Sequence, residues 1–218
     1  MLSVIIPVFN EEASIIGLIE RVRSVPLTKE IIVVDDCSQD LTPELLRTIP
    51  GIKLLTHSRN QGKGAAIRTG LKYAQGKFVI IQDADFEYDP NDYPRLIAPF
   101  ADKSVGAVFG SRFRGRGKFL IPSFLANIFL SFLTNALYGS KITDMETCYK
   151  VIKRSLLQKL ALVANRFEIE PEITAKLLRC RFRIVEVPIH YAARREGKKI
   201  GWRDGVAAIK SLIKWYVR

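Results

Sequence analysis

The first half of the chain alternates short apolar runs with amphipathic segments. Continuous apolar runs, typical of buried parallel strands, lie at residues 2–9, 30–35, 52–57, 78–82 and 107–112. Helical spacing of apolar residues is visible at 11–25 and at 63–74. Asn10 is placed to cap the first helix, and Glu11 and Glu12 would favour its positive end. This alternation predicts a mostly parallel sheet with helices on both sides, whose ligands bind beyond the carboxyl ends of the strands.

The alternation is lost after residue 113. Helical patterns follow at 123–138, 168–180 and 202–218, with one strand-like stretch at 182–190. No stretch is rich enough in Gly, Ser or Pro to serve as a linker, and 218 residues suit one domain. We therefore expect a single domain over residues 1–218, in which the second half adds a helical layer.

Residues 119–140 carry no charge and are bracketed by Lys118 and Lys141. Their length alone would span a bilayer. Polar residues recur at helical spacing within one arc, however, and leave a broad apolar face, which predicts an amphipathic helix. Such a helix suits either the protein core or a membrane interface, and the pattern leaves both open. The polar residues of the arc are Ser123, Asn127, Ser131, Thr134, Asn135 and Tyr138.

Composition and charge narrow the class of protein. With 48% hydrophobic and 26% charged residues the chain is neither disordered nor of low complexity. The net charge is +12, and residues 176–218 carry most of it, which predicts contact with nucleic acid, phosphate-bearing substrates or a membrane surface. The three widely spaced cysteines argue against a disulfide framework and indicate a reducing compartment. No basic segment precedes the first apolar run, so we expect no cleaved signal peptide.

Acidic residues follow three of the predicted strands. Glu11 comes after the first strand, Asp36 after the second, and Asp83 and Asp85 after the fourth. Asp83 and Asp85 can point the same way in an extended segment, and two hard oxygen ligands suit Mg²⁺ or Mn²⁺ on a phosphate. Glu87 is a candidate third ligand. Taken alone, an Asp-x-Asp pair is more often a solvated turn or a cap.

A glycine-rich segment at residues 60–66, NQGKGAA, opens the second predicted helix. A glycine-rich helix start that carries Lys63 favours an anion. The segment is neither a Walker A loop nor a dinucleotide fingerprint, because His57 and Ile67 stand where those motifs need glycine. This argues against a P-loop ATPase and a Rossmann dehydrogenase.

Six motifs make the sequence recognisable: PVFNEE, VVDDCSQD, NQGKGAA, QDADFEYDP, GSRF and DMETCYK. In this order and spacing the chain resembles the inverting family 2 glycosyltransferases of GT-A fold. It is most similar to the polyprenyl-phosphate sugar transferases of the dolichyl-phosphate mannose synthase type, from residue 3 to about 205. The resemblance implies an α/β fold with a Rossmann-like, mostly parallel sheet, flanking helices and a C-terminal amphipathic, basic helical layer. Residues 1–113 would bind the nucleotide sugar, and residues 114–218 would face the acceptor and the membrane.

The resemblance also implies the site for a GDP- or UDP-linked sugar donor. Asp85, with Asp83 and Glu87, would hold Mg²⁺ or Mn²⁺ on the diphosphate, where the metal stabilises the charge of the leaving group. Arg112 in GSRF would face the phosphates, although a surface arginine and the partner of a carboxylate fit the sequence equally well. The residues that would contact the nucleotide sugar are Pro7, Phe9, Glu11, Asp36, Lys63, Asp83 and Ala84.

For the acceptor, the segment HYAARREGKKIGWRDG resembles a phosphate-binding stretch, which implies roles for Arg194 and Lys199. A phosphate acceptor needs positioning and charge screening rather than a strong base. For a hydroxyl acceptor Asp144 is the candidate base and Glu146 a weaker one. The position of Asp144 after Thr143 also suits a helix cap. We expect structural roles for both histidines.

We therefore predict a metal-dependent inverting hexosyltransferase that moves a sugar from a nucleotide sugar to a polyprenyl phosphate, dolichyl or undecaprenyl. An alternative is a family 2 transferase that acts on a polysaccharide or another hydroxyl acceptor. A non-catalytic basic module is a third hypothesis, but such a module has no use for three strand ends with carboxylates, and we expect no nucleic-acid partner. The basic C-terminal stretch and the amphipathic segment predict a cytoplasmic enzyme held peripherally on the inner face of the membrane. A separate membrane protein that docks on residues 119–138 is left open.

Overall fold

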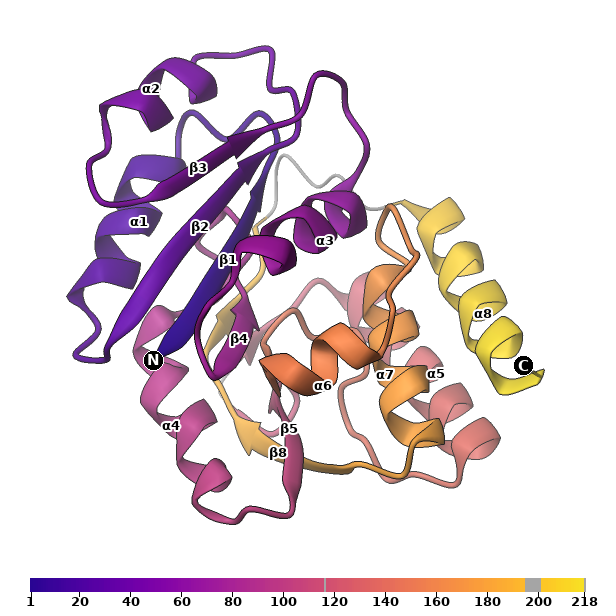
Figure 1. The fold of residues 1–218 in the computed structure, drawn as a ribbon. Coiled ribbons are helices and arrows are strands. Elements are labelled where there is room, and N and C mark those ends of the chain that lie inside the picture. Colours follow the sequence, from indigo (N-terminus) through magenta and orange to yellow (C-terminus); the bar gives the residue numbers. More distant parts are fainter. Residues whose placement is uncertain (116, 195–200, 218) are drawn as a thin grey trace.

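The computed structural model describes residues 1–115, 117–194 and 201–217. Seven strands form one sheet in the order β3-β2-β1-β4-β7-β5-β8 (Figure 1). β7 is antiparallel to both of its neighbours, and the other described strand pairs of the sheet are parallel. The strands are β1 Leu2–Val8, β2 Lys29–Asp35, β3 Lys53–Thr56, β4 Phe78–Ile81, β5 Val105–Ser111, β7 Lys150–Lys153 and β8 Arg183–Pro188, and a separate two-stranded ladder joins β6 Gly117–Lys118 to β9 Tyr191–Ala192.

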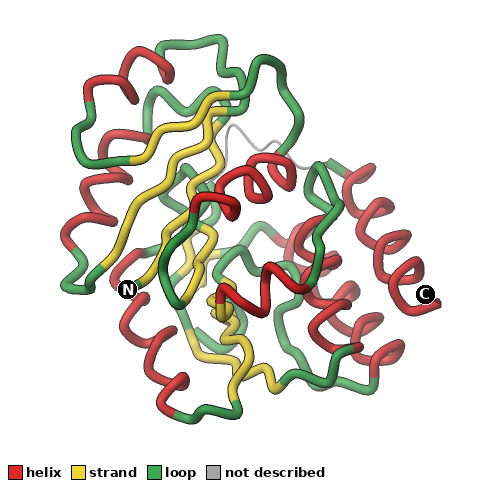
Figure 2. Tube along the Cα trace, viewed as in Figure 1, coloured by secondary structure: helices red, strands yellow, loops and turns green. Residues whose placement is uncertain are grey.

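Helices flank the sheet, and the predicted α/β class is confirmed (Figure 2). α5, α7 and α8 pack against one another as a layer in the second half of the chain. The helices are α1 Ile15–Ser24, α2 Thr42–Thr48, α3 Lys63–Tyr73, α4 Tyr93–Ile97, α5 Ile121–Tyr138, α6 Arg154–Lys159, α7 Ile169–Arg179 and α8 Trp202–Val217, with short 3₁₀ turns η1 Pro90–Asp92 and η2 Ala98–Ala101.

The core lies on both sides of the central strands. Ile5 in β1, Val33 in β2 and Ile80 in β4 are fully buried, and every residue of β5 is buried. Strands that are covered on both faces need apolar side chains at successive positions, which explains the continuous apolar runs in the sequence.

The helix predicted at 11–25 begins later, at Ile15. Asn10 does not cap it: this residue has a positive φ of 51°, and its side-chain oxygen accepts from the Gln39 N–H at 2.7 Å. The Glu11 N–H donates to the Thr42 hydroxyl at 2.9 Å. The residues after β1 are thus tied to the segment after β2 and lie at the strand-end edge, where ligands are expected to bind, rather than in a first helical turn.

β7 was not predicted. Its two central residues, Val151 and Ile152, are fully buried between β4 and β5. A strand with so short an apolar stretch gives no clear periodicity, because partners far away in the sequence decide its conformation. The loss of regular alternation after residue 113 corresponds to this antiparallel insertion.

The polar arc of α5 faces the protein. Ser131 and Thr134 are buried, the Asn135 side chain bonds to both backbone groups of Ile142, and the Tyr138 hydroxyl donates to the Leu212 carbonyl at 2.7 Å. Only 17% of the helix is buried, so the interpretation as a core helix is wrong. By length and composition alone α5 is apolar enough to cross a membrane. Its exposed large apolar residues are Ile121, Leu125, Ile128, Phe129 and Phe132.

Candidate active site

The carboxyl ends of β1, β2 and β4 meet at one edge of the sheet. Val8 pairs with Asp35 across β1 and β2, and the Asp36 N–H donates to the Val8 carbonyl at 2.8 Å. On the other side of β1, Ile5 pairs with Ile81 at the end of β4. The segments that leave these three strands therefore start side by side, which places their acidic residues at a common edge.

Arg194 connects three of these carboxylates. Its guanidinium lies 3.2 Å from Glu11 Oε1, 3.5 Å from Asp85 Oδ2 and 3.9 Å from Glu87 Oε1. Its backbone N–H also donates to Glu87 Oε1 at 2.9 Å. Arg194, which was predicted to meet the acceptor phosphate, thus lies beside Asp85 and Glu87, which were predicted to hold the metal. Lys199, its predicted companion, lies outside the described residues.

The carboxylates around Asp85 need more positive charge than Arg194 supplies. Burial, together with the charges of Asp83 and Glu87, raises the pKa of Asp85 to about 7. Among the described residues no three metal-binding side chains form a ready-made cage. Asp85 and Glu87 offer hard oxygen ligands and leave other coordination positions to phosphate and water, an arrangement that Mg²⁺ favours. The residues would therefore fit a divalent metal, which would supply positive charge to a diphosphate.

Asp83 differs from Asp85 because it has its own lysine. Lys63 Nζ lies 2.6 Å from Asp83 Oδ1 and 3.4 Å from Glu170 Oε1. Burial opposes ionisation of Asp83, but the Lys63 ammonium outweighs it and lowers the pKa of this carboxyl. Asp83 is therefore an ionised, oriented acceptor, and Asp85 is the carboxylate left for a metal.

Asp36 organises the glycine-rich loop. Its carboxylate accepts from the backbone N–H groups of Gln61 at 2.8 Å and Gly62 at 2.7 Å, and it lies 2.7 Å from His57 Nδ1. His57 is thereby a structural residue, as expected. The anion at this loop is a carboxylate of the chain itself. Direct contact of Asp36 with the nucleotide stays a prediction.

Close backbone packing explains the glycines of this loop. Gly62 has a φ of 95°, and a Cβ at this position would collide with the Asn165 carbonyl. A Cβ on Gly64 would lie 2.5 Å from the Ala164 carbonyl oxygen. The loop before α7 therefore covers the start of α3 and fixes the position from which Lys63 reaches Asp83.

Arg112 has a buried carboxylate partner. Its Nε and Nη2 donate to Asp144 at 2.8 and 2.7 Å, and its backbone N–H donates to the same carboxylate at 2.9 Å. No helix begins at Asp144 in the described part of the chain, so the cap interpretation is wrong. With both oxygens bonded to Arg112, Asp144 is an anchor for that arginine rather than an available base.

Tyr191 links Arg112 to the acidic cluster, by which we mean Glu11, Asp85 and Glu87. The Arg112 guanidinium lies 5.1 Å from the centre of the Tyr191 ring, and the Tyr191 hydroxyl donates to Glu87 Oε2 at 2.8 Å. Arg112 is thus positioned through the ring next to Glu87. Sequence reasoning did not select Tyr191, although it precedes Arg194 in the segment that resembles a phosphate-binding stretch.

Two of the remaining residues predicted to contact the donor lie at the end of β1. Pro7 and Phe9 are half-buried there. Ala84 is buried, and its carbonyl accepts from the Ser14 hydroxyl at 2.8 Å. His190 is held by Asp92, which accepts from its backbone N–H at 2.7 Å. The Ser14–Ala84 hydrogen bond ties the loop between Asp83 and Glu87 to the start of α1.

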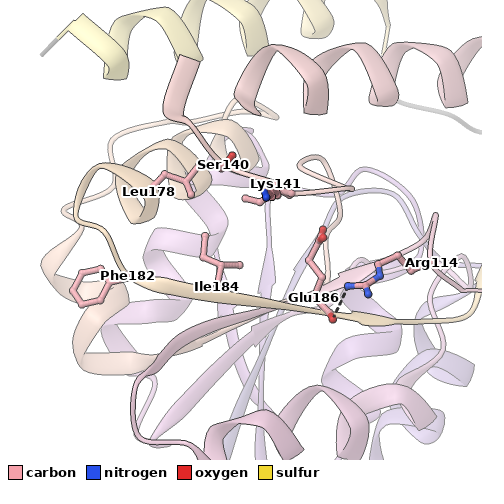
Figure 3. A pocket seen from close by; sticks show the side chains of 8 residues that line it. Arg114, Ser140, Lys141, Leu178, Phe182, Ile184 and Glu186 are labelled. Carbon is pink, nitrogen blue, oxygen red and sulfur yellow. Dashed lines mark hydrogen bonds between the residues drawn. The ribbon is translucent and has the colours of Figure 1, made fainter. Parts of the chain in front are cut away.

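Two hollows lie near these residues. One, of about 440 Å³, adjoins Glu87 and Tyr191 and extends to Lys118, just before α5. The other, of about 270 Å³, lies beside β8 (Figure 3). There Arg114 donates to the Glu186 carbonyl at 3.2 Å, and none of the predicted site residues lines the hollow.

Residues 3–161 match the sequence model of the family described as glycosyl transferase family 2. The chain belongs to this family. The predicted family is thereby confirmed, and the acidic cluster at the strand ends is the candidate active site of a family 2 glycosyltransferase.

Curated relatives of this family 2 glycosyltransferase cover most of the chain. It is 31% identical over 208 residues to the dodecaprenyl-phosphate galacturonate synthase of Rhizobium johnstonii, with 90% of this chain and 60% of that protein aligned. The chain thus spans less than two thirds of that relative. It is 29% identical over 213 residues to the UDP-N-acetylglucosamine–dolichyl-phosphate N-acetylglucosaminyltransferase of Methanococcus voltae, with 87% and 84% aligned.

Solved structures share the fold. Glucosyl-3-phosphoglycerate synthase from Mycobacterium tuberculosis, in complex with Mn²⁺, UDP and glucosyl-3-phosphoglycerate, superposes with a TM-score of 0.76 at 20% identity. The match covers 100% of this chain and 80% of that one. The likeness extends to the helical layer of the second half, because it includes the whole chain.

Proposed function

We propose that this family 2 glycosyltransferase transfers a sugar from a GDP- or UDP-linked donor to a polyprenyl phosphate. The observation that carries the proposal is the acidic cluster of Glu11, Asp85 and Glu87 around Arg194 at the strand ends. The names of both curated relatives given above include a polyprenyl phosphate, dodecaprenyl in one and dolichyl in the other, which supports this acceptor class.

In the donor site Asp85 and Glu87 would hold Mg²⁺ or Mn²⁺. The metal supplies positive charge to the leaving diphosphate when it is bound. Asp83, fixed by Lys63, would accept a hydrogen bond from a ribose hydroxyl. Pro7 and Phe9 are placed to border the nucleotide at the end of β1.

In the acceptor site Arg112 would screen phosphate charge. Asp144 holds its guanidinium through two hydrogen bonds, so the arginine keeps one orientation without the entropy cost of a free side chain. The acceptor phosphate is already anionic, and in-line attack on the sugar carbon needs no strong base. Arg194 would move from the acidic cluster to the phosphate once a metal occupies the cluster, and Lys199 would assist it.

A membrane surface is the proposed location. α5 exposes an apolar face. The neighbouring helix α8 packs against α5 and exposes Trp202, Val206 and Ile213 next to basic residues. Each basic residue near an anionic leaflet contributes about 1 kcal/mol. The hollow of about 440 Å³ lies between Glu87 of the acidic cluster and Lys118, which precedes α5 in the sequence. We therefore propose a peripheral enzyme on the cytoplasmic face of the membrane.

A hydroxyl acceptor is the second candidate, and Glu146 favours it. Glu146 Oε1 is buried without a hydrogen-bond partner in the described structure, and burial raises the pKa of this carboxyl to about 7. A carboxyl that titrates near neutral pH is suited to accept the proton of an attacking hydroxyl. The best base candidate is then Glu146 rather than Asp144.

The test is transfer from radiolabelled UDP- and GDP-sugars, with Mn²⁺, to vesicles that contain undecaprenyl or dolichyl phosphate. We expect label in an organic-soluble product that depends on the lipid phosphate. Label that stays in a water-soluble glycan would favour the hydroxyl acceptor. Absence of transfer from every nucleotide sugar, with protein that is folded, would contradict the proposal.

A further inference from the structure

We propose that Glu170 is a positioning residue of the donor site, which fixes the Lys63 ammonium so that Lys63 holds Asp83 in one orientation. The inference rests on the proposed function, because it assigns Asp83 to the donor. It adds a residue of α7 to the Lys63–Asp83 pair, whose two members lie in the first half of the chain.

The contacts form an alternating row of charges. Asp83 Oδ1 lies 2.6 Å from Lys63 Nζ, which lies 3.4 Å from Glu170 Oε1. Glu170 Oε2 in turn lies 2.6 Å from Lys150 Nζ. The ends of β4, α3, α7 and β7 are thus joined by negative, positive, negative and positive groups in sequence.

The four side chains of the row become more exposed from Lys150 to Asp83. The Lys150 side chain is fully buried, Glu170 is 5% exposed, Lys63 13% and Asp83 26%. Only the Asp83 end reaches the open edge of the sheet. Buried charges are costly unless they are paired, and removal of one partner leaves its neighbour uncompensated. Removal of the Glu170 charge would therefore leave the Lys63 ammonium with one fewer charged partner.

One Glu170 oxygen faces Lys63 from a buried position. Among the described residues Glu170 Oε1 is a buried atom without a hydrogen bond, and its ion-pair partner is Lys63. Burial alone would lower the pKa of Lys63, but the charges of Asp83 and Glu170 raise it well above its usual value. Glu170 is therefore a second carboxylate, besides Asp83, at the Lys63 ammonium.

Glu172, on the same helix, provides a matched comparison. It is fully buried, lies 2.6 Å from Lys176 Nζ and accepts from the backbone N–H groups of Val163 and Ala164. It thus contacts the loop before α7 and Lys176. Like Glu170, Glu172 is buried and pairs with a lysine, but its lysine is Lys176, and among the described residues it makes no contact with Lys63 or Asp83.

The experiment measures UDP and GDP affinity by calorimetry with Mn²⁺ for wild type, Glu170→Gln, Glu172→Gln, Lys63→Met and the variant with both Lys63→Met and Glu170→Gln. We expect Glu170→Gln to weaken binding about tenfold, in the range of coupling between neighbouring charged groups. Glu172→Gln should lower thermal stability, and because it keeps the Lys63–Glu170 contact it should weaken nucleotide binding less than Glu170→Gln does. In the Lys63→Met background Glu170→Gln should weaken binding no further, because Glu170 acts through Lys63.

Three results would count against the inference. Wild-type nucleotide affinity in folded Glu170→Gln would overturn it. An equal loss of affinity on Glu170→Gln in the wild-type and Lys63→Met backgrounds would also overturn it, because it indicates a merely structural role.

Should Glu170→Gln not fold, the variant with both Glu170→Gln and Lys150→Met removes one charge of each sign, and we expect the same tenfold loss of affinity there. A wild type that binds neither nucleotide would instead overturn the proposed function, and this inference with it.

Discussion

The guanidinium of Arg194 lies 3.5 Å from the carboxylate of Asp85, where a divalent metal is proposed to bind. Since like charges exclude each other at this distance, the arginine and the metal compete for the same carboxylates. We expect Arg194→Gln to bind Mn²⁺ about tenfold more tightly in the absence of nucleotide. Titration of free Mn²⁺ by electron paramagnetic resonance measures this. Arg114→Gln, whose arginine contacts the Glu186 carbonyl, is the control; equal affinities for wild type and Arg194→Gln would contradict the competition.

The Arg112–Asp144 pair allows stability and function to be separated. Asp144→Leu leaves a buried arginine without its partner, and we expect a loss of about 3–5 kcal/mol in unfolding free energy. The variant with both Arg112→Leu and Asp144→Leu should regain most of that stability, yet transfer no sugar. Denaturant unfolding and the transfer assay check the two statements. Normal transfer by the double variant would show that Arg112 is structural only.

Glu146 gives a pH dependence of stability. Because its pKa is raised to about 7, the folded protein keeps a proton that the unfolded chain loses at lower pH, so stability falls as the pH rises toward 7. Glu146→Gln removes this loss. At pH 8 we expect the variant to melt at a higher temperature than wild type, by about 2–4 °C for each kcal/mol recovered. At pH 4 the two melting temperatures should differ less. The exposed Glu44→Gln is the control. A difference that is the same at both pH values would contradict the raised pKa.

The apolar face of α5 is expected to bind membranes. Phe132→Glu places a charge on that face, where the side chain is 67% exposed, and should abolish co-sedimentation with anionic vesicles at low salt. Nucleotide binding should not change, because the residue lies outside the acidic cluster. Leu41→Glu, which alters a side chain 62% exposed at the start of α2, should sediment as wild type does. Unchanged sedimentation of Phe132→Glu would leave the membrane-surface proposal without support.

The sequence predicted the strands that build the ligand edge and the acidic residues beyond them, because buried parallel strands have a strong local pattern. It did not predict the Arg194–Glu11 contact, whose residues are 183 positions apart. It showed that α5 is amphipathic, but periodicity alone does not tell which face turns inward; the polar face does so here because Asn135 bonds to the loop that follows. The division into a nucleotide-sugar half, residues 1–113, and an acceptor half, residues 114–218, stays a prediction. Glu170 of the second half contacts Lys63 of the first.

The central claim is that the strand-end carboxylates form a metal-dependent nucleotide site. Calorimetric titration with UDP and with GDP, each with and without Mn²⁺, on wild type and Asp85→Asn tests it most directly. We predict that one nucleotide binds wild type only with Mn²⁺ and that Asp85→Asn loses this binding while its Lys63–Asp83 pair remains. Metal-independent binding that survives in Asp85→Asn, or no binding of either nucleotide to the folded wild type, would contradict the claim.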